Sequence, residues 1–313
     1  MKPSRRKRLR NRLLRRVFEL SQRVGLDVLP RHYYSSIPDV RSLRRSERWR
    51  PPRSMIGVAG TDLDEQLRFV EECCPPTLRE EVRRRSVYHD ACDENGAVGF
   101  GPIEADFLFC FVAARRPRRV VQVGAGVSTS VILRAGAHVR HDLDVTCVDP
   151  YPTDFLRRAA AESRITLVEE PAQEVPLEVL TGLGPGDLLF VDSTHTVGPD
   201  SEVNRIVLEV LPRLQKGSFV HFHDLLFPYD YARDLLSDAL FFWNETALVH
   251  AFLVGNDRFR LAASLSMLHY GRTEELRSFL PNYRPEGSSH GLAPPTRSND
   301  RHFPSSTYLE AMR

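Results

Sequence analysis

Short apolar runs alternate with amphipathic segments along the middle of the chain, and this alternation is its clearest structural signal. The apolar runs span four or five residues and are rich in Val, Leu and Ile, which is typical of strands buried on both faces of a sheet. They lie at 120–123, 145–148, 165–168, 188–191 and 219–223. Apolar residues at helical spacing follow two of these runs, at about 128–137 and 200–214. Strands that alternate with helices predict an α/β fold with a Rossmann-like, doubly wound, mostly parallel sheet, whose ligands bind beyond the carboxyl ends of the strands.

The flanking segments divide the chain into three predicted parts. Residues 1–54 are a basic amino-terminal arm, helical up to about residue 24 and proline-containing after it. Residues 55–270 are the main domain, and residues 271–313 are an irregular tail rich in Pro, Ser and Gly, with a short edge strand at 305–309. Around its core the main domain adds helices within 61–87, at about 103–114 and within 235–254, and a last strand at 259–263.

Two glycines, Gly124 and Gly126, lie in the turn between the first strand and the helix that follows it. Glycine lets the backbone approach a ligand closely and adopt φ values that other residues resist. Ser128 or Thr129 is placed to cap the helix, whose first N–H groups favour an anionic ligand group. The dinucleotide fingerprint G-x-G-x-x-G needs a third glycine where Thr129 stands, which weakens the case for a nicotinamide cofactor. The motif indicates a nucleotide-type cofactor, and an ordinary strand–helix turn is the alternative.

Acidic residues follow four of the five predicted strands, namely Asp149, Glu169, Asp192 and Asp224. Asp149 comes 25 residues after Gly124, at the end of the second strand. A carboxylate in that position accepts the ribose hydroxyls of an adenosine-containing ligand. A polar cap on the end of the strand is the alternative interpretation of Asp149.

The candidate catalytic residues are Asp192, His195, His223 and Asp224. Asp192 ends the fourth strand, and His195 follows in a loop, where a histidine near its ordinary pKa suits the role of general base. Alternation along the fifth strand places His221 and His223 on one face, with His223 nearer the carboxyl end. Asp192, His223 and Asp224 also suit a divalent cation such as Mg²⁺, although their spacing matches no fixed signature. Local hydrogen bonding is the alternative for His195, and burial in the core is the alternative for His221.

Charge is unevenly distributed along a chain whose formal net charge is only +2. The first 53 residues are strongly basic and the remainder is acidic. A basic amphipathic segment at 1–24 predicts contact with an anionic membrane surface or another polyanion, and a partly ordered terminal helix is the alternative. The five cysteines match no zinc spacing, and we find neither a secretory signal nor an apolar run long enough to span a bilayer. We therefore expect a cytoplasmic protein with reduced thiols, peripheral at the membrane if the arm binds lipid.

Five stretches, taken together and in this order, resemble bacterial class I S-adenosylmethionine (SAM) dependent methyltransferases related to the sugar and antibiotic O-methyltransferases. They are 99–102, 123–129, 148–150, 190–195, and 220–225 with 243–245 after it. The resemblance implies a seven-stranded sheet of five parallel strands and a carboxyl-terminal hairpin. It also implies that SAM lies across Gly124, Gly126 and Asp149, with its adenine near Gln173 and with Ser128 and Thr129 among the cofactor-binding residues. Some relatives use a metal to orient sugar hydroxyls, which keeps that option open here.

We therefore predict a SAM-dependent methyltransferase that methylates a hydroxyl oxygen of a small molecule or a sugar. Gln122 departs from the resemblance, because Glu or Asp is common at this position and a charged contact to SAM is lost. The alternatives are an RNA-directed methyltransferase that uses the basic arm, a nicotinamide-dependent oxidoreductase, and a non-catalytic SAM-binding module. The fourth strand lacks the Asn/Asp-Pro-Pro-aromatic motif of amino-group methylation, which argues against methylation of a base nitrogen.

Overall fold

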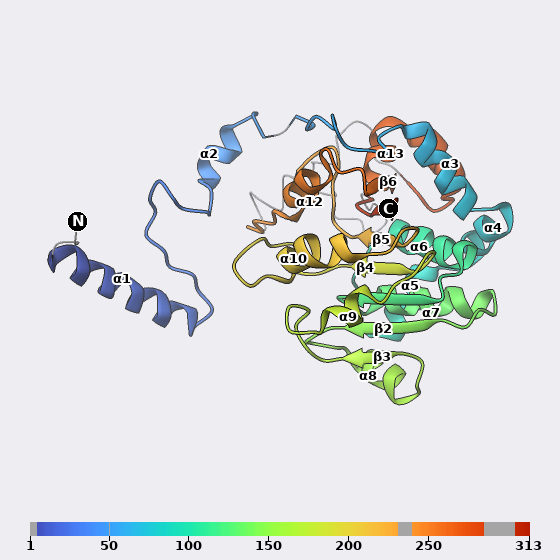
Figure 1. The fold of residues 1–313 in the computed structure, drawn as a ribbon, viewed down its shortest axis with the longest axis horizontal. Helices are drawn as coiled ribbons and strands as arrows, with labels where there is room; N and C mark the ends of the chain where they lie inside the picture. Colours follow the sequence, from blue (N-terminus) through green and yellow to red (C-terminus); the bar gives the residue numbers. More distant parts are fainter. Residues whose placement is uncertain (1–4, 50, 231–239, 285–303) are drawn as a thin grey trace. The chain divides into compact units, whose positions relative to one another are not determined.

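The computed structural model describes residues 5–49, 51–230, 240–284 and 304–313. The chain divides into two compact units, Met1–Arg45 and Ser46–Arg313. The first unit contains α1 (Arg5–Gln22) and α2 (Val40–Arg45). The second unit contains the sheet and the helices that cover it (Figure 1).

A seven-stranded sheet with the strand order β3-β2-β1-β4-β5-β7-β6 forms the centre of the second unit (Figure 1). Its five parallel strands are β1 (Arg119–Val123), β2 (Asp144–Val148), β3 (Thr166–Val168), β4 (Leu188–Val191) and β5 (Phe219–Phe222). The last two strands, β6 (Phe259–Ser264) and β7 (Thr307–Ala311), are antiparallel to their neighbours. The structure thus confirms the predicted α/β fold with its mostly parallel sheet of seven strands.

The position of β7 corrects two predictions about the end of the chain. We predicted an irregular tail with an edge strand, but β7 lies between β5 and β6, and β6 forms that edge of the sheet. Tyr308 and Leu309 are fully buried, so β7 is a core strand although its sequence carries only a short apolar run. The predicted tail also contains a helix, α14 (Thr273–Phe279), whereas 285–303 lie outside the described residues. The strands β6 and β7 are therefore not joined as a tight hairpin.

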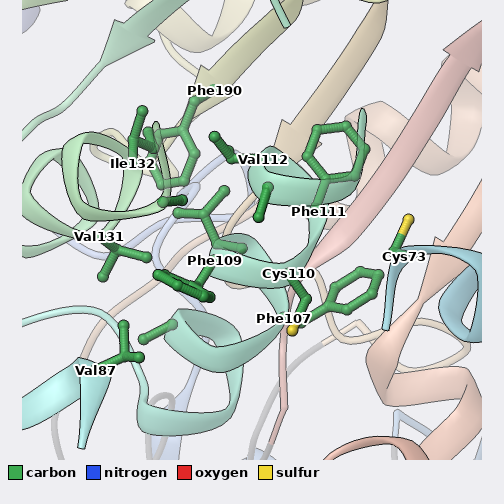
Figure 2. Packing of buried hydrophobic residues seen from close by; sticks show 14 of the residues in the cluster. Cys73, Val87, Phe107, Phe109, Cys110, Phe111, Val112, Val131, Ile132 and Phe190 are labelled. Carbon is green, nitrogen blue, oxygen red and sulfur yellow. The ribbon is translucent and has the colours of Figure 1, made fainter. Parts of the chain in front are cut away.

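Alternate residues of the strands pack into two separate cores, one on each face of the sheet. One face is covered by α3 (Leu63–Cys73), α4 (Pro76–Arg84), α5 (Val87–Asn95), α6 (Pro102–Arg115), α7 (Val127–His138) and α8 (Asp154–Ala161). Figure 2 shows Phe107, Phe109 and Phe111 of α6 in this core, together with Phe190 of β4 and Ile132 of α7. Because α6 is apolar on nearly every side, it forms the buried centre of this layer.

The opposite face of the sheet is covered by α9 (Leu177–Thr181), α10 (Glu202–Arg205) and α12 (Glu245–Leu253). The predicted helix at 200–214 consists of α10, a π-helical turn (Ile206–Val210) and a 3₁₀ turn (Leu211–Arg213). Within the predicted helix at 235–254, α12 begins only at Glu245, and 235–239 lie outside the described residues. A further helix, α13 (Leu265–Gly271), directly follows β6.

Candidate active site

The turn between β1 and α7 brings the ends of three parallel strands together. Gly124 has a φ of +80°, and a Cβ built on it would lie 1.7 Å from the backbone oxygen of Asp192. Its N–H donates to the carbonyl of Val148 (3.0 Å), the last residue of β2. No other residue fits at Gly124, because any side chain would displace the end of β4.

The hydroxyl groups of Ser128 and Thr129 contact the side chain of Gln122 at the end of β1. Gln122 donates from Nε2 to Ser128 Oγ (3.0 Å), and Thr129 Oγ1 donates to Gln122 Oε1 (2.8 Å). Thr129 also accepts from the N–H of Gly126 (3.1 Å), which is the N-cap residue of α7. The prediction that Ser128 or Thr129 is the N-cap is therefore wrong. Both side chains are buried and support the turn through Gln122.

Asp149 follows β2 and holds the glycine turn through a hydrogen bond. Its Oδ2 accepts from the N–H of Ala125 (3.1 Å), and its Oδ1 accepts from the N–H of Tyr151 (2.8 Å). An ionised carboxylate has about four lone-pair positions. Each oxygen of Asp149 thus retains a lone pair for a further donor.

Gln173 lies in the loop after β3, and the guanidinium of Arg205 fixes this loop by its backbone. Arg205 donates to the carbonyl oxygens of Ala172 (3.2 Å), Gln173 and Val175 (2.6 Å). The side chain of Gln173 is half-buried. The turn that carries Asp149 and the loop that carries Gln173 follow the neighbouring strands β2 and β3, so both lie at the same edge of the sheet.

The four predicted catalytic residues come together at the carboxyl ends of β4 and β5. His195 Nε2 lies 3.5 Å from Asp192 Oδ1 and 3.7 Å from Asp224 Oδ2. His223 Nδ1 lies 3.3 Å from the same oxygen of Asp192 and 3.6 Å from the same oxygen of Asp224. Two imidazoles thus share two carboxylates, and both imidazoles are buried. We call Asp192, His195, His223 and Asp224 the His–Asp cluster.

Residues from both ends of the second unit complete the surroundings of this cluster. The ring of Phe100 packs against the ring of His223 with 4.8 Å between centroids. Ser305 Oγ donates to Asp224 Oδ1 (2.9 Å), and the N–H of Ser305 donates to Glu104 Oε1 (2.7 Å). The loop before α6 and the segment before β7 therefore both reach the site.

The amino-terminal end of α12 covers His195. Glu245 Oε2 accepts a hydrogen bond from His195 Nδ1 (2.8 Å), and the ring of Trp243 lies 4.5 Å from the imidazole. The carbonyl of His195 accepts from the N–H groups of Asn244 (3.0 Å) and Glu245 (3.2 Å). His195 is thus held by its side chain and by its backbone, which rules out the interpretation of a histidine with only local contacts.

His221 belongs to the core and not to the cluster. Its Nε2 hydrogen-bonds to Ser306 Oγ (2.7 Å), and its ring stacks on Phe190 at 4.3 Å. Burial lowers the pKa of His221 well below its ordinary value, so the ring is neutral. This environment agrees with the alternative of a buried core histidine.

The charges of the His–Asp cluster strongly shift the pKa values of its histidines and of Asp192. Burial alone would lower the pKa of His195 and His223, but the neighbouring carboxylates raise both values to about 10. Burial favours the neutral form of Asp192, yet His223 and His195 hold its pKa well below its usual range. The prediction that His195 titrates near its ordinary pKa is therefore wrong, because the sequence does not reveal how many carboxylates surround it.

Three of the eight described non-glycine residues with a positive φ lie at the same place. Phe100, His195 and Asp224 have φ values of +58°, +57° and +55°, a region that non-glycine residues rarely adopt. Each such residue costs of order 1–3 kcal/mol and persists only where its surroundings enforce it. Strain at three residues of one site points to a functional constraint on their side chains.

The arrangement gives no support to a metal centre. Among the residues that the structure describes, no group of three or more His, Cys, Asp or Glu side chains is placed to hold a metal ion. In the predicted set of Asp192, His223 and Asp224, the imidazole contacts the carboxylates directly. The donor atoms face one another and are paired as charges.

The sequence analysis assigned no role to three residues of the site, namely Glu104, Glu245 and Ser305. Glu104 and Glu245 are acidic residues in the first turn of apolar helices, and both are buried. An acidic residue that begins an apolar helix was the available signal, although a favourable helix dipole explains it equally well. Ser305 begins the predicted edge strand at 305–309 and carries no local signal for a role in the site.

Comparisons with known proteins agree with this architecture. Residues 121–225 match the model of a family described as a methyltransferase domain. The chain is 28% identical over 210 residues to an uncharacterised protein of Archaeoglobus fulgidus, a stretch that covers 63% of this chain and 90% of that protein. The chain is similar to the solved structure of the methyltransferase PaMTH1 of Podospora anserina, which contains bound S-adenosylhomocysteine (SAH). The two chains are 18% identical, the TM-score is 0.37, and the match covers 60% of this chain and 82% of that one. It also resembles the plantazolicin methyltransferase BamL in complex with an analogue of desmethyl-plantazolicin and SAH, with 12% identity, a TM-score of 0.40 and coverage of 80% and 97%.

The family match spans β1 to the end of β5, so it contains the glycine turn and the whole His–Asp cluster. The seven-stranded sheet around it has the α/β architecture expected of class I methyltransferases. The matched family therefore places a methyltransferase domain at 121–225, in agreement with the predicted SAM-dependent methyltransferase.

Proposed function

We propose that this protein transfers the methyl group of SAM to a hydroxyl oxygen of a small molecule or a sugar, and that the His–Asp cluster receives the hydroxyl proton. The observation that carries the proposal is the position of the cluster next to the glycine turn. The backbone oxygen of Asp192 lies against Gly124, and the side chain of Asp192 contacts both histidines. A cofactor at the turn and an acceptor at the cluster would therefore be neighbours.

Gly124, Gly126 and Asp149 are the residues that would hold SAM. Both glycines of the turn lack a side chain, and both oxygens of Asp149 retain a lone pair for a ribose hydroxyl. Gln173, at the same edge of the sheet, would lie near the adenine. Bound SAM supplies a methyl group on a sulfonium sulfur, which is already a strong electrophile. The protein's own tasks are then to align the acceptor and to accept a proton.

His223 is the best-placed proton acceptor of the cluster. Neither of its ring nitrogens completes a hydrogen bond within the described residues, although the side chain is buried. A buried polar group without a hydrogen bond is costly. The hydroxyl group of the methyl acceptor would supply a hydrogen bond that the imidazole of His223 lacks. An imidazole accepts a proton only in its neutral form. Because the carboxylates raise the pKa of His223 to about 10, the proposed role requires the ring to lose its proton first, and methyl transfer should therefore increase as the pH rises above neutrality.

Calorimetric titration with SAM tests the proposal first, with NADH as the control ligand and with Mg²⁺ present or absent. We expect SAM to bind and NADH not to bind, with no dependence on Mg²⁺. Sugar and polyketide hydroxyl compounds would then be screened for transfer of a labelled methyl group. If the folded protein does not bind SAM, the proposal is wrong. If it binds SAM but methylates no hydroxyl compound, the non-catalytic alternative gains support.

We propose, as a second function of the protein, that α1 binds an anionic membrane surface and so places a cytoplasmic enzyme at the membrane. Leu9, Leu13 and Leu20 recur at helical spacing and are 70%, 63% and 60% exposed. Arg12 and Arg16 lie among the many cations of the same helix. A helix with an apolar stripe and Arg-rich polar positions is typical of segments that lie in the lipid headgroup region. Among the described helices, none is long and apolar enough to cross a bilayer.

Co-sedimentation with lipid vesicles tests this second role. Vesicles of phosphatidylserine and phosphatidylcholine should retain the protein, and vesicles of pure phosphatidylcholine should retain little of it. Leu13→Glu together with Leu20→Glu should abolish retention. Asn11→Glu together with Gln22→Glu, which adds the same charge at two exposed polar positions, should reduce it only slightly. Equal retention of both glutamate variants would refute insertion of the apolar stripe, and RNA binding with a steep salt dependence would favour a nucleic-acid acceptor instead.

A further inference from the structure

Glu245 is a buried carboxylate whose contacts converge on one side chain. It is the first residue of α12, and only 1% of it is exposed. Its Oε2 accepts the hydrogen bond from His195 Nδ1 at 2.8 Å, whereas its Oε1 has no hydrogen-bond partner within the described residues. Burying a carboxylate is expensive unless it is paired. The pairing with His195 is therefore the interaction that makes this burial tolerable.

The backbone around Glu245 holds the same loop. The N–H groups of Asn244 and Glu245 both donate to the carbonyl of His195, at 3.0 and 3.2 Å. Asn244 Oδ1 accepts from the N–H of Val197 at 2.5 Å. His195 itself has a φ of +57°, which needs support from its surroundings. The residues at the start of α12 thus fix both the backbone and the imidazole of a residue 50 positions earlier in the chain.

We propose that Glu245 is a positioning residue of the active site, which holds Nδ1 of His195 so that Nε2 faces the carboxylates of Asp192 and Asp224. The Nε2 atom lies 3.5 and 3.7 Å from these carboxylates, on the side of the ring opposite Glu245. Glu245 itself contacts neither Asp192 nor Asp224 by hydrogen bond, so it acts through His195. The value of this orientation for methyl transfer rests on the proposed function, but the orientation itself does not.

Glu202 provides a matched control. It too is the first residue of a helix, α10, it is buried with 9% exposed, and it contacts the same loop. Its Oε1 accepts from the backbone N–H of Thr194 at 2.9 Å. Glu202 therefore supports the loop without contacting the imidazole. A change that only loosens the loop should appear in both glutamine variants, whereas a change in the His195 ring should appear only with Glu245.

The test is NMR spectroscopy of the full chain labelled with ¹⁵N-histidine, with the His195 signals identified by their loss in His195→Asn. In the wild type we expect the Nδ1 proton of His195 to give a downfield signal that exchanges slowly with water, because it is hydrogen-bonded and buried. Glu245→Gln retains an acceptor oxygen but loses the negative charge, so it should shift the signal upfield and speed its exchange with water, whereas Glu202→Gln should leave the signal unchanged. Calorimetry with SAM is run on the same samples and should give affinities within twofold of the wild type. A His195 signal in Glu245→Gln that keeps its wild-type position and exchange rate would overturn the proposal, whereas absence of SAM binding in the wild type would overturn only the proposed function.

A thermal unfolding cycle keeps the proposal testable if Glu245→Gln folds poorly. His195→Asn and Glu245→Gln should each lower the melting temperature, because the first leaves Glu245 buried without its partner and the second replaces a charged hydrogen bond by a weaker neutral one. The double variant should lose less than half of the summed losses of the two single variants. Losses that simply add would show that the two side chains stabilise the protein independently, and the proposal would be wrong.

Discussion

Asp106 should make the protein less stable as the pH rises, and replacing it should remove that dependence. The side chain lies on α6 and is 2% exposed. Burial raises its pKa from 3.8 to about 7, against the effect of a hydrogen bond from Asn282 Nδ2 (2.7 Å). It lines a surface cavity with Arg83, Arg85, His89 and Arg284, but no ion pair joins it to them in the described chain. The folded state therefore holds a proton that the unfolded state loses at lower pH.

The sign and the size of the effect follow from these two values. The pKa is raised in the folded state, so the stabilising contribution is fully present below the unfolded pKa near 4 and is lost as the pH rises to about 7. One pKa unit corresponds to about 1.4 kcal/mol, so the complete loss is about 4 kcal/mol. Between pH 5 and pH 8 the protein should lose about 3 kcal/mol through this residue alone, since the change ends near pH 7.

Urea unfolding of the wild type and of Asp106→Asn at pH 5 and pH 8 measures this loss. The difference in the free energy of unfolding between the two proteins should move by about 3 kcal/mol in favour of the variant between these pH values. Comparing the difference at two pH values cancels the cost of burying an amide, because that cost does not depend on pH. If the difference is the same at both pH values, Asp106 is ionised in the folded protein at pH 5 and the reasoning is refuted.

Asp187→Asn is the matched control for this experiment. Asp187 is also 2% exposed, but its carboxylate accepts from the backbone N–H groups of Arg118 (3.1 Å), Arg119 (2.9 Å) and Gly184 (2.8 Å). Hydrogen bonds to a charged group contribute about 1.5–3 kcal/mol. We expect Asp187→Asn to destabilise the protein at both pH values, whereas Asp106→Asn should stabilise it at pH 8.

Further predictions concern the site and the core. Asp149→Ala should weaken SAM binding by about tenfold or more, because two or more hydrogen bonds are lost. His223→Ala should bind SAM as the wild type does. Calorimetry measures both affinities, and equal affinity of the two variants would contradict the assignment of Asp149 to the cofactor site. Gly124→Ala should abolish SAM binding or prevent folding, since its Cβ would lie 1.7 Å from the Asp192 oxygen, whereas Gly186→Ala, with a similar φ and no atom within 4 Å, should cost only about 1 kcal/mol. All five cysteines are buried, so a thiol reagent should label them only after unfolding, and rapid labelling of the native protein would show that the core opens.

The sequence predicted the parts of the site that depend on neighbouring residues. Strand β1, its glycine turn and the acidic residue after β2 all lie within one short segment, so local patterning was enough to place them. To predict that Asp192 and His223 lie close together, one further assumption was needed, namely that β4 and β5 are adjacent. The structure confirms that these two strands pair. The convergence of Asp192, His223 and Asp224 follows from that single pairing.

What the sequence did not predict depends on distant residues. Glu245 is 50 positions from the histidine that it contacts, and Ser305 is 81 positions from Asp224. No periodicity links such pairs, because their contact results from the packing of α12 and β7 against the sheet. The prediction that His195 has an ordinary pKa was wrong for the same reason, because the pKa depends on carboxylates from three separate segments. Ser128 was expected to bind the cofactor. Its hydroxyl group instead faces inward, because it accepts a hydrogen bond from the side chain of Gln122.

The place of β7 determines when a growing chain can finish folding. Residues 307–311 leave the ribosome after the six other strands of this sheet, yet they fill a position inside it. Until they arrive, β6 has no neighbour and one side of β5 is open, so an incomplete chain exposes two unpaired strand edges. Ser305 and Ser306 arrive with the same strand and bring the contacts to Asp224 and His221. Translation therefore delivers the last piece of the sheet and the last piece of the site together, and a prematurely terminated product would have neither.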